Sequence, residues 1–494
     1  MAVLTCADLI RQGRNLSLPF ELEVTVGNRE QVQTSLVITQ LFRLMPGKRL
    51  VGLTTWNDEP ALIKLFYQPH HWQRHLEREH KGNRNLMEAR VSTPPLLETG
   101  TTSDGKAALL LNRFLADAVN LGELLASGEL SLLSNDLGLL EKLIALLSRC
   151  HEKGVWQQDI HLDNFILHEG RIYFLDGADV NVETLGAALG ETRSLDNLAW
   201  FFAQFPVHQD AGIGRLFQHY CQCRSARQFR TSEQDFLRLV RDARRQRLAN
   251  YRKKLLRSTT AHLAIRTAQD FMVVDRELLG AELDRLVADP DSYIESGQVI
   301  KAGNTCTVAL IDLNGRKLVL KRYNIKSFLH RLKRLFGRSR AESSWCSALQ
   351  LRMLGIGTAR PLMMLEQRSL GILRGKAWFL AEFVPGENLL QGSAALSQQP
   401  SGLDQLMGAF GELFQAMQIY HFTHGDMKES NFIFRDGRLA VLDLDAMVWH
   451  EKPAAFAKAF NKDLQRFARN WNDKADMEAI ADRAHNVMQE FLAE

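Results

Sequence analysis

One pattern of acidic and amide residues occurs twice in the chain, and this repeat limits the folds available to it. Residues 155–180 read VWQQDIHLDNFILHEGRIYFLDGADV, and residues 422–447 read FTHGDMKESNFIFRDGRLAVLDLDAM. The two segments align without a gap, and the same separation reaches a further aspartate in each half. The matched residues are Asp159, Asn164, Asp176 and Asp196 in the first half, with Asp426, Asn431, Asp443 and Asp463 in the second. Identical spacing over this distance predicts an internal duplication.

Each copy has the pattern of a loop followed by a β-hairpin. A polar loop leads to a short apolar stretch, a turn with glycine (EGR or DGR) and a second apolar stretch that ends in aspartate. We therefore expect a hairpin lined with carboxylates. Because Asp and Asn are common turn residues, a structural role would be the simpler interpretation of a single copy. Repetition at fixed spacing favours a functional role.

A lysine lies inside an apolar stretch upstream of each copy, Lys64 in ALIKLFY and Lys321 in LVLKRYN. A buried ammonium group is costly unless an anion pairs with it, so each lysine is expected to have an acidic partner. A helical stretch, further strands and a hinge-like connector then separate each lysine from its polar loop.

This order of elements resembles the protein-kinase-like fold. The resemblance implies an α+β fold class with two tandem kinase-like domains, each with a small β-rich lobe and a mainly helical large lobe. We expect an N-terminal extension at 1–30, a first domain at 31–245, a basic, helical junction at 246–284 and a second domain at 285–494. The residues that carry the resemblance are Lys64, Glu79, Asp159, Asn164 and Asp176, then Gly303, Lys321, His424, Asp426, Asn431 and Asp443.

The second half is also similar to one family of sugar kinases. Its phrases LGIGTARPL, HGDMKESNFIF, VLDLDAM and KDLQRFARNW resemble bacterial lipopolysaccharide core kinases, the Kdo and heptose kinase family. The resemblance implies ATP and Mg²⁺ as cofactors. It also implies phosphate transfer to a heptose or Kdo hydroxyl of the lipopolysaccharide core oligosaccharide or its lipid-linked precursor.

Two other functions remain open. An atypical protein Ser/Thr kinase is one, although neither half shows an Ala-Pro-Glu segment after a long activation loop. A non-catalytic pseudokinase scaffold of core assembly is the other. Phosphate transfer to a polypeptide, or a cellular phenotype that survives loss of both loop aspartates, would identify these alternatives.

By the family resemblance, the residues of each half take the roles that phosphoryl transfer requires. Asp426 and Asp159 would accept the proton of the acceptor hydroxyl. Lys321 and Lys64 would contact the phosphates, while Gly303 lies in the segment KAGNTCTV that covers them and Glu79 orients Lys64. The implied metal ligands are Asn431, Asp443, Asn164 and Asp176. Adenine would meet backbone groups near 112–115 and 381–384.

Each half departs from the kinase pattern differently. The first has Gln157 where the loop usually has His, and its covering hairpin FRLMPGKRLVGLTTW lacks spaced glycines. In the second, the helix register places Ser344 where Glu79 lies in the first. Glu342 is two residues away, on another side of the helix, and can reach Lys321 only if the helix is shifted. One of the two domains is therefore a candidate for an inactive domain.

Composition narrows the compartment and the class of protein. The 494 residues are 45% hydrophobic with a formal net charge of +4, as in a soluble protein of two or three domains. Six cysteines without metal-finger spacing favour a reducing compartment. The sequence shows no signal-peptide pattern and no apolar run long enough for a membrane span, so we expect a cytoplasmic protein.

Two segments, 224–257 and 316–340, are strongly basic. In the latter, cations alternate with apolar residues. This fits either peripheral contact with an anionic surface, on the cytoplasmic face of the inner membrane, or a helix packed on its own lobe. The former fits a helix that links the domains. Base-reading modules and interleaved aromatic residues are absent, so nucleic acid is not expected as a partner.

Overall fold

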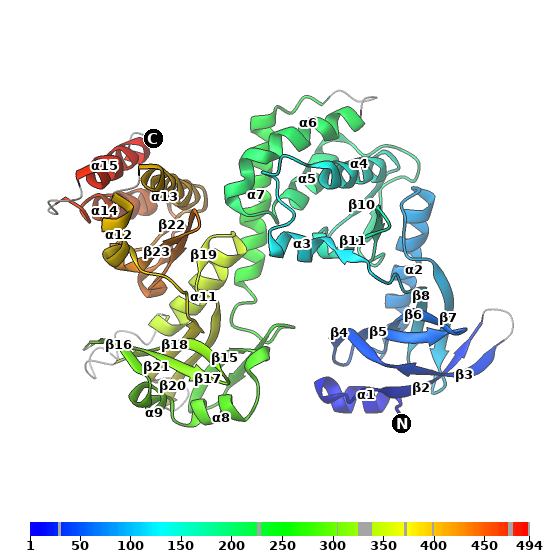
Figure 1. Ribbon diagram of the computed structural model, residues 1–494. Coiled ribbons are helices and arrows are strands. Elements are labelled where there is room, and N and C mark those ends of the chain that lie inside the picture. The colour runs from blue at the N-terminus through cyan, green and yellow to red at the C-terminus, as the bar shows by residue number, and fades with distance from the viewer. Residues whose placement is uncertain are drawn as a thin grey trace. The chain divides into compact units, whose positions relative to one another are not determined.

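The chain forms two compact units in the computed structural model (Figure 1). The first contains Met1–Phe205 and Gln209–Ala243, and the second contains Pro206–His208 and Arg244–Glu494. The structure describes residues 1–27, 31–224, 229–303, 305–324, 338–369, 373–397, 400–472 and 478–492. Each unit combines a large, mainly antiparallel sheet with a group of helices, as an α+β fold class predicts.

The first unit contains an eight-stranded sheet in the order β1-β2-β7-β8-β6-β5-β4, with β3 paired to β2. Residues 1–30, expected to form an extension, supply β1, helix α1 and β2 to it, because their apolar side chains enter the same core as Ile63. The elements are β1 Ala2–Val3, α1 Cys6–Gln12, β2 Phe20–Val26, β3 Val32–Ile38, β4 Gln40–Met45, β5 Arg49–Trp56, β6 Glu59–Phe66, β7 Leu96–Thr102 and β8 Ala108–Arg113.

Side chains along β6 alternate between the two faces of the sheet, and this alternation fixes the direction of Lys64. Ile63 and Leu65 are fully buried in the core on one sheet face, so Lys64 points to the opposite face. Helix α2 follows, and it turns the buried Glu79 toward this lysine.

Helices α2 to α6 and the short strands of the first unit enclose a separate apolar core. They are α2 Trp72–Glu88, β9 Val119–Asn120, α3 Leu121–Ser127, α4 Gly138–Glu152, β10 Val155–Gln157, β11 Phe165–His168, β12 Arg171–Phe174, β13 Val180–Val182, α5 Glu191–Phe202 and α6 Ile213–Cys223.

The second unit has a seven-stranded sheet in the order β14-β15-β20-β21-β18-β17-β16. Around the lysine strand β18, this order repeats the run β2-β7-β8-β6-β5-β4 of the first unit. Residues 246–284, expected to be a helical junction, include β14 and β15 of this sheet. The strands are β14 His262–Arg266, β15 Asp270–Asp275, β16 Gln298–Ala302, β17 Cys306–Leu313, β18 Arg316–Tyr323, β20 Pro361–Ser369 and β21 Leu373–Glu382.

Apolar cores cover both faces of this second sheet. Helices α8 (Ala281–Ala288) and α9 (Pro290–Ser296) pack with Leu318 and Leu320 on one face. Helix α11 (Arg340–Met353) packs on the other, in the core that continues into the helical part of the unit. Figure 1 shows that part as a group of helices separate from the sheet. Its elements are β19 Gly357–Thr358, α12 Leu389–Ser397, α13 Pro400–Tyr420, β22 Phe422–Thr423, β23 Phe432–Arg435, β24 Arg438–Val441, β25 Val448–Trp449, α14 Pro453–Ala468 and α15 Glu478–Leu492.

The two predicted hairpins are confirmed. Strands β11 and β12 pair from Phe165↔Phe174 to His168↔Arg171, and β23 and β24 pair from Phe432↔Val441 to Arg435↔Arg438. Both two-residue turns have positive φ at each central position, with Glu169 and Gly170 in one and Asp436 and Gly437 in the other. This turn matches the twist of the flanking strands and explains the glycine.

The structure describes most of one basic segment and little of the other. Helix α7 (Glu233–Arg252) occupies much of 224–257, and its residue Arg244, 1% exposed, donates to the Tyr420 hydroxyl at 2.6 Å. Its neighbour Arg245 donates to the carbonyl of Ile419 at 2.8 Å. These arginines therefore pack within the second unit. Most of the other basic segment, 325–337, lies outside the described residues, and its surface role stays a prediction. None of the helices in the described ranges has the length and apolar character of a membrane span.

Candidate functional site

The second unit brings its strand lysine to the polar loop. Lys321 Nζ lies 3.0 Å from Asp443 Oδ1, and this contact joins β18 to the second residue after β24. Burial acts to raise the pKa of Asp443, but Lys321 and its hydrogen bond outweigh burial, so this pKa lies below its ordinary value. Asp443 also has φ 56° and ψ 60°, a left-handed conformation that is uncommon outside glycine and is often found at functional sites.

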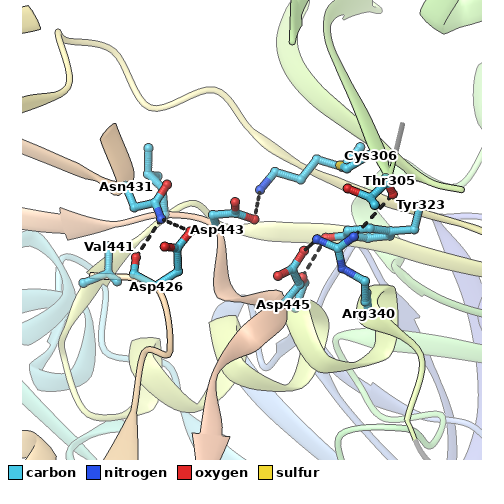
Figure 2. Close-up of polar contacts among 12 residues, drawn as sticks. Thr305, Cys306, Tyr323, Arg340, Asp426, Asn431, Val441, Asp443 and Asp445 are labelled. Carbon is cyan, nitrogen blue, oxygen red and sulfur yellow. Dashed lines mark hydrogen bonds and ion pairs between the residues drawn. The ribbon is translucent and has the colours of Figure 1, made fainter. Parts of the chain in front are cut away.

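The loop before β23 holds Asp426 and Asn431 together. The side-chain nitrogen of Asn431 donates to the Asp426 carbonyl at 2.8 Å and to its carboxylate at 3.3 Å (Figure 2). Lys428 Nζ donates to the same carboxylate at 2.8 Å. Among the described residues, nothing bonds to the side-chain oxygen of Asn431. That oxygen and the Asp443 carboxylate are the hard oxygen donors that Mg²⁺ prefers.

Hydrogen bonds from two buried residues hold this loop in place. Asp463, 4% exposed, accepts from the backbone nitrogens of His424 at 2.7 Å and Gly425 at 3.1 Å. The His424 ring bonds to the Leu442 carbonyl at 2.8 Å and accepts from the Asp426 backbone nitrogen at 3.2 Å. The histidine thus ties the Asp426 loop to the strand that leads to Asp443.

Helix α11 does not supply a glutamate to Lys321. Ser344, the residue counted into that register, bonds to the Tyr323 hydroxyl at 2.9 Å. Glu342 pairs with Arg338 at 3.4 Å and Arg374 at 3.8 Å. The helix is therefore not shifted to present Glu342, and the acidic partner of Lys321 is Asp443.

An arginine makes the connection from α11 instead. Arg340 Nη2 lies 2.5 Å from Asp445 Oδ2, and Nη1 donates to the Thr305 carbonyl at 3.3 Å (Figure 2). Its guanidinium also lies over the Tyr323 ring, 4.8 Å from the centroid. Burial and the neighbouring Asp443 raise the pKa of Asp445, although Arg340 acts to lower it. One arginine therefore touches the covering segment, the lysine strand and the loop after Asp443.

The covering segment of the second unit lies beside the lysine. Lys301 on β16 pairs with Val308 on β17, and Val308 pairs with Lys321, so these side chains share one row on the same face of the sheet. Gly303 follows at the end of β16, and its carbonyl accepts from Asn324 at 3.5 Å.

The first unit also joins its lysine to the polar loop. Lys64 Nζ donates to Glu79 Oε1 at 2.5 Å and to the Leu175 carbonyl at 2.7 Å. Burial raises the pKa of Glu79 in spite of Lys64, since its side chain has no exposed surface. The Gly177 backbone nitrogen donates to the same carboxylate at 3.4 Å, which places Asp176 beside the ion pair.

The polar loop of the first unit resembles the loop of the second, with Gln157 in the position of His424. Asn164 donates to Gln157 Oε1 at 3.1 Å and to the Asp159 carbonyl at 3.3 Å. Gln157 in turn donates to the Asp176 carbonyl at 3.1 Å, so it makes the same connection between loop and strand as His424. Asn164 therefore lies as Asn431 does, with its side-chain oxygen unused by any described residue, while Asp159 is exposed.

One residue correspondence is wrong. Asp196 was matched to Asp463 by spacing, but Asp196 is exposed. The adjacent Asn197 is buried and donates to the Gln157 carbonyl at 2.7 Å, so it supports the loop in place of a carboxylate. Its side-chain oxygen bonds to the ring of the buried His151 at 3.1 Å, so α5 is turned by one residue relative to the alignment.

Sequence reasoning missed four side chains of the two sites: Arg49, Asn197, Arg340 and Asp445. The second aspartate of VLDLDAM was a signal for Asp445, and the arginine at the start of SRAESSW was a signal for its partner. Across the described ranges, no group of three or more His, Cys, Asp or Glu side chains is arranged to hold a metal ion. A metal at either site would rely on the Asn and Asp pair together with oxygens from a ligand.

Comparisons with known proteins give one family and a set of distant structures. No curated protein matches the chain. Three solved structures of the PknI kinase domain of Mycobacterium tuberculosis, one a cysteine-to-alanine mutant, are each 13% identical, covering 42% of this chain and 95% of the solved chain. Their TM-score against this chain is 0.26. Residues 284–488, less than half of the chain, match the lipopolysaccharide kinase (Kdo/WaaP) family, and this match contains Lys321, Asp426, Asn431 and Asp443.

Proposed function

We propose that the second unit is an ATP-dependent kinase that phosphorylates a heptose or Kdo hydroxyl of the lipopolysaccharide core or its lipid-linked precursor. The observation that carries this proposal is the meeting of Lys321 and Asp443 beside the Asp426–Asn431 pair, within the segment that matches lipopolysaccharide kinases. Fold alone would not select an acceptor, so the sugar class rests on the family match.

The side chains suit in-line phosphoryl transfer. Lys321 would contact the phosphates of ATP, because its ammonium is held beside the proposed metal ligand Asp443. Asn431 and Asp443 would hold Mg²⁺, which neutralises phosphate charge when bound. Asp426 would take the proton of the sugar hydroxyl as that oxygen bonds to the γ-phosphorus and ADP departs. Lys428 and Asn431 fix the orientation of its carboxylate.

We also propose that the first unit is a second copy of the kinase-like fold. Support comes from the shared strand order around the two lysine strands and from the identical pairing of the two hairpins. The domains would extend over 31–245 and 285–494, with strands added from 1–30 and 246–284. In the first unit, Lys64 and Glu79 would take the cofactor-binding positions and Asn164 and Asp176 the metal positions. Asp159 would stand in the place of the base.

The proposed substrate places the reaction at the cytoplasmic face of the inner membrane, with peripheral contact through basic residues. A direct test is the mass spectrum of core sugars from cells that carry Asp426→Ala or Asp159→Ala. Loss of a core phosphate with Asp426→Ala supports the proposal. An unchanged spectrum with both substitutions would support a scaffold, and phosphate on a polypeptide would support a protein kinase.

A further inference from the structure

The first unit has a permanent cation beside its candidate metal ligand. Arg49 begins β5, and its Nη1 lies 3.9 Å from Asp176 Oδ2. The two side chains are 24% and 17% exposed, so solvent screens this pair only in part. Burial acts to raise the pKa of Asp176, but Lys64 and Arg49 outweigh it, and the pKa lies below its ordinary value. The carboxylate therefore lies near the Arg49 guanidinium and beside the Lys64–Glu79 ion pair.

The second unit has no such cation at the corresponding position. Val51 pairs with Lys64, and Val308 pairs with Lys321, so the register aligns the two sheets. Two residues before each valine, on the same sheet face, stand Arg49 in the first unit and Cys306 in the second. Burial raises the pKa of the Cys306 thiol, which is neutral at physiological pH. In the described part of the second unit, Lys321 is the one ion-pair partner of Asp443. Lys301 and Arg340 lie farther away and also act to lower the pKa of Asp443.

A second arginine extends the positive charge of the first unit. Arg43 on β4 pairs with Val51, so it lies in the same row as Lys64 and on the same face, and Lys301 has the corresponding position beside Lys321 in the second unit. Burial and Arg49 lower the pKa of Arg43, while Asp176, Asp163 and Asp159 raise it. A guanidinium stays charged under these influences. Arg43 is exposed, so its fork is accessible to a ligand.

Lys64, Arg49 and Arg43 carry positive charge of the kind that a metal otherwise brings to a triphosphate. Arg49 places a positive charge beside Asp176 at a strand position where the second unit has the neutral Cys306, and this charge repels a divalent cation. Guanidinium groups bind phosphate oxygens in a two-pronged geometry and cannot lose their proton. The same strand position in the second unit leaves Asp443 available to a metal.

We propose that the first unit binds a nucleoside triphosphate without a divalent cation, through Arg43, Arg49 and Lys64. This inference rests on the proposed kinase-like fold of that unit, and it assigns nucleotide binding rather than phosphate transfer to it. The first unit then acts as a nucleotide-occupied partner of a metal-dependent second unit.

The test measures ATP binding by calorimetry on the full chain that carries Lys321→Met and Asp443→Ala, which disable the second site. We expect the Kd for ATP to differ less than threefold between excess EDTA and excess Mg²⁺. Adding Arg49→Cys, the residue of the second unit, should weaken binding in EDTA at least tenfold and make it Mg²⁺-dependent. Arg171→Cys, an exposed arginine at the start of β12, is the matched control and should leave both Kd values unchanged.

Two results would overturn the inference: ATP binding that EDTA abolishes in the parent chain, or no binding in either condition. Circular dichroism spectra that match the parent separate lost binding from lost folding. Because the second site is disabled throughout, these outcomes do not depend on sugar phosphorylation. Failure of the proposed function would appear only in the wild-type transfer assay.

Discussion

Arg340 and Asp445 form an ion pair at 2.5 Å that ties helix α11 to the loop after Asp443. In the first unit, Lys64 and Glu79 connect the corresponding helix α2 to the lysine strand. Arg340 is the counterpart of His75 in the first unit. Each lies four residues before a matched helix residue, Ser344 and Glu79 respectively. His75 stacks on Phe66 just as Arg340 lies over Tyr323. The second unit therefore anchors its helix by a different charge pair, one turn earlier.

Removing half of this pair should damage both stability and nucleotide use. Arg340→Met leaves the Asp445 carboxylate, 7% exposed, without its cation, and an uncompensated buried charge costs about 3–5 kcal/mol. Because the pair positions the loop of Asp443, kcat/KM for ATP should fall at least tenfold while KM for the sugar changes little. Urea denaturation and steady-state kinetics measure the two effects.

The double variant Arg340→Met with Asp445→Leu provides the control for this pair. It removes both charges, so stability should recover toward wild type, with a coupling energy of about 1–3 kcal/mol in the double-mutant cycle. The kinetic defect should remain, since the link between helix and loop is still broken. Additive losses of stability would show that the two side chains act independently.

A glycine contact should make the first unit intolerant of a single methyl group. A Cβ on Gly82 of α2 would lie 1.7 Å from the Gly177 carbonyl oxygen, next to Asp176. Alanine normally stabilises a helix by about 1 kcal/mol over glycine. Here Gly82→Ala should instead destabilise the unit by about 1–3 kcal/mol or more, because the backbone atoms must separate. Urea denaturation followed by far-UV circular dichroism measures the change.

Gly408→Ala is the matched control for this substitution. Gly408 lies in α13, is exposed and has no heavy atom within 4 Å of a built Cβ. The change should therefore stabilise the chain by up to about 1 kcal/mol. Equal effects of Gly82→Ala and Gly408→Ala would contradict the close approach of α2 and the Asp176 loop.

Acid should destabilise the first unit through His151. This fully buried ring bonds to the Tyr220 hydroxyl at 2.7 Å and to Asn197 at 3.1 Å, and burial lowers its pKa to about 4. The folded state keeps the ring neutral, whereas the unfolded state binds a proton near the ordinary histidine pKa. Stability is thus fully present above about pH 6.5 and falls by about 3 kcal/mol as the pH approaches 4.

His151→Gln removes the titrating group and should flatten this part of the pH profile, measured as the free energy of unfolding between pH 7 and 4. His71→Gln, at an exposed position before α2, should retain the wild-type slope. A parallel slope for wild type and His151→Gln would assign the acid sensitivity to other groups.

The proposed base should separate chemistry from nucleotide binding. Asp426→Asn keeps the size of the side chain but cannot accept the hydroxyl proton, so kcat should fall about 10²–10⁴-fold while the Kd for ATP stays close to wild type. Asp436→Asn, in the exposed turn of the β23–β24 hairpin, should leave kcat unchanged, since Asn also adopts the left-handed conformation there. Full activity of Asp426→Asn would remove Asp426 from this role.

Local patterns in the sequence predicted the parts of the structure that local chemistry determines. The two hairpins followed from alternating strands and glycine turns, and the buried Lys64 pointed to an anionic partner because its charge could not be left alone. The register count that placed Ser344 against the lysine strand also agrees with its bond to Tyr323, two residues after Lys321.

The remaining features depend on contacts between distant segments, which one sequence does not encode in a local pattern. Strand β2 pairs with β7, and β15 pairs with β20, and each partner lies far along the chain. The local sequence of β2 and of β15 therefore does not show that they belong to a sheet. Asn197 takes the place expected for Asp196, and its bond to His151, on a different helix, is a contact that spacing alone does not reveal. Arg49 and Arg340 became site residues only when sheet register and helix packing placed them near carboxylates.

Transfer of phosphate to the lipopolysaccharide core tests the central claim most directly. Purified full-length protein is incubated with Mg-ATP and chemically dephosphorylated core oligosaccharide, and the products are analysed by mass spectrometry. We predict one added phosphate on a heptose or Kdo residue, lost with Asp443→Ala and retained with Asp436→Asn. Absence of sugar phosphate from a wild-type protein that binds ATP normally would contradict the account.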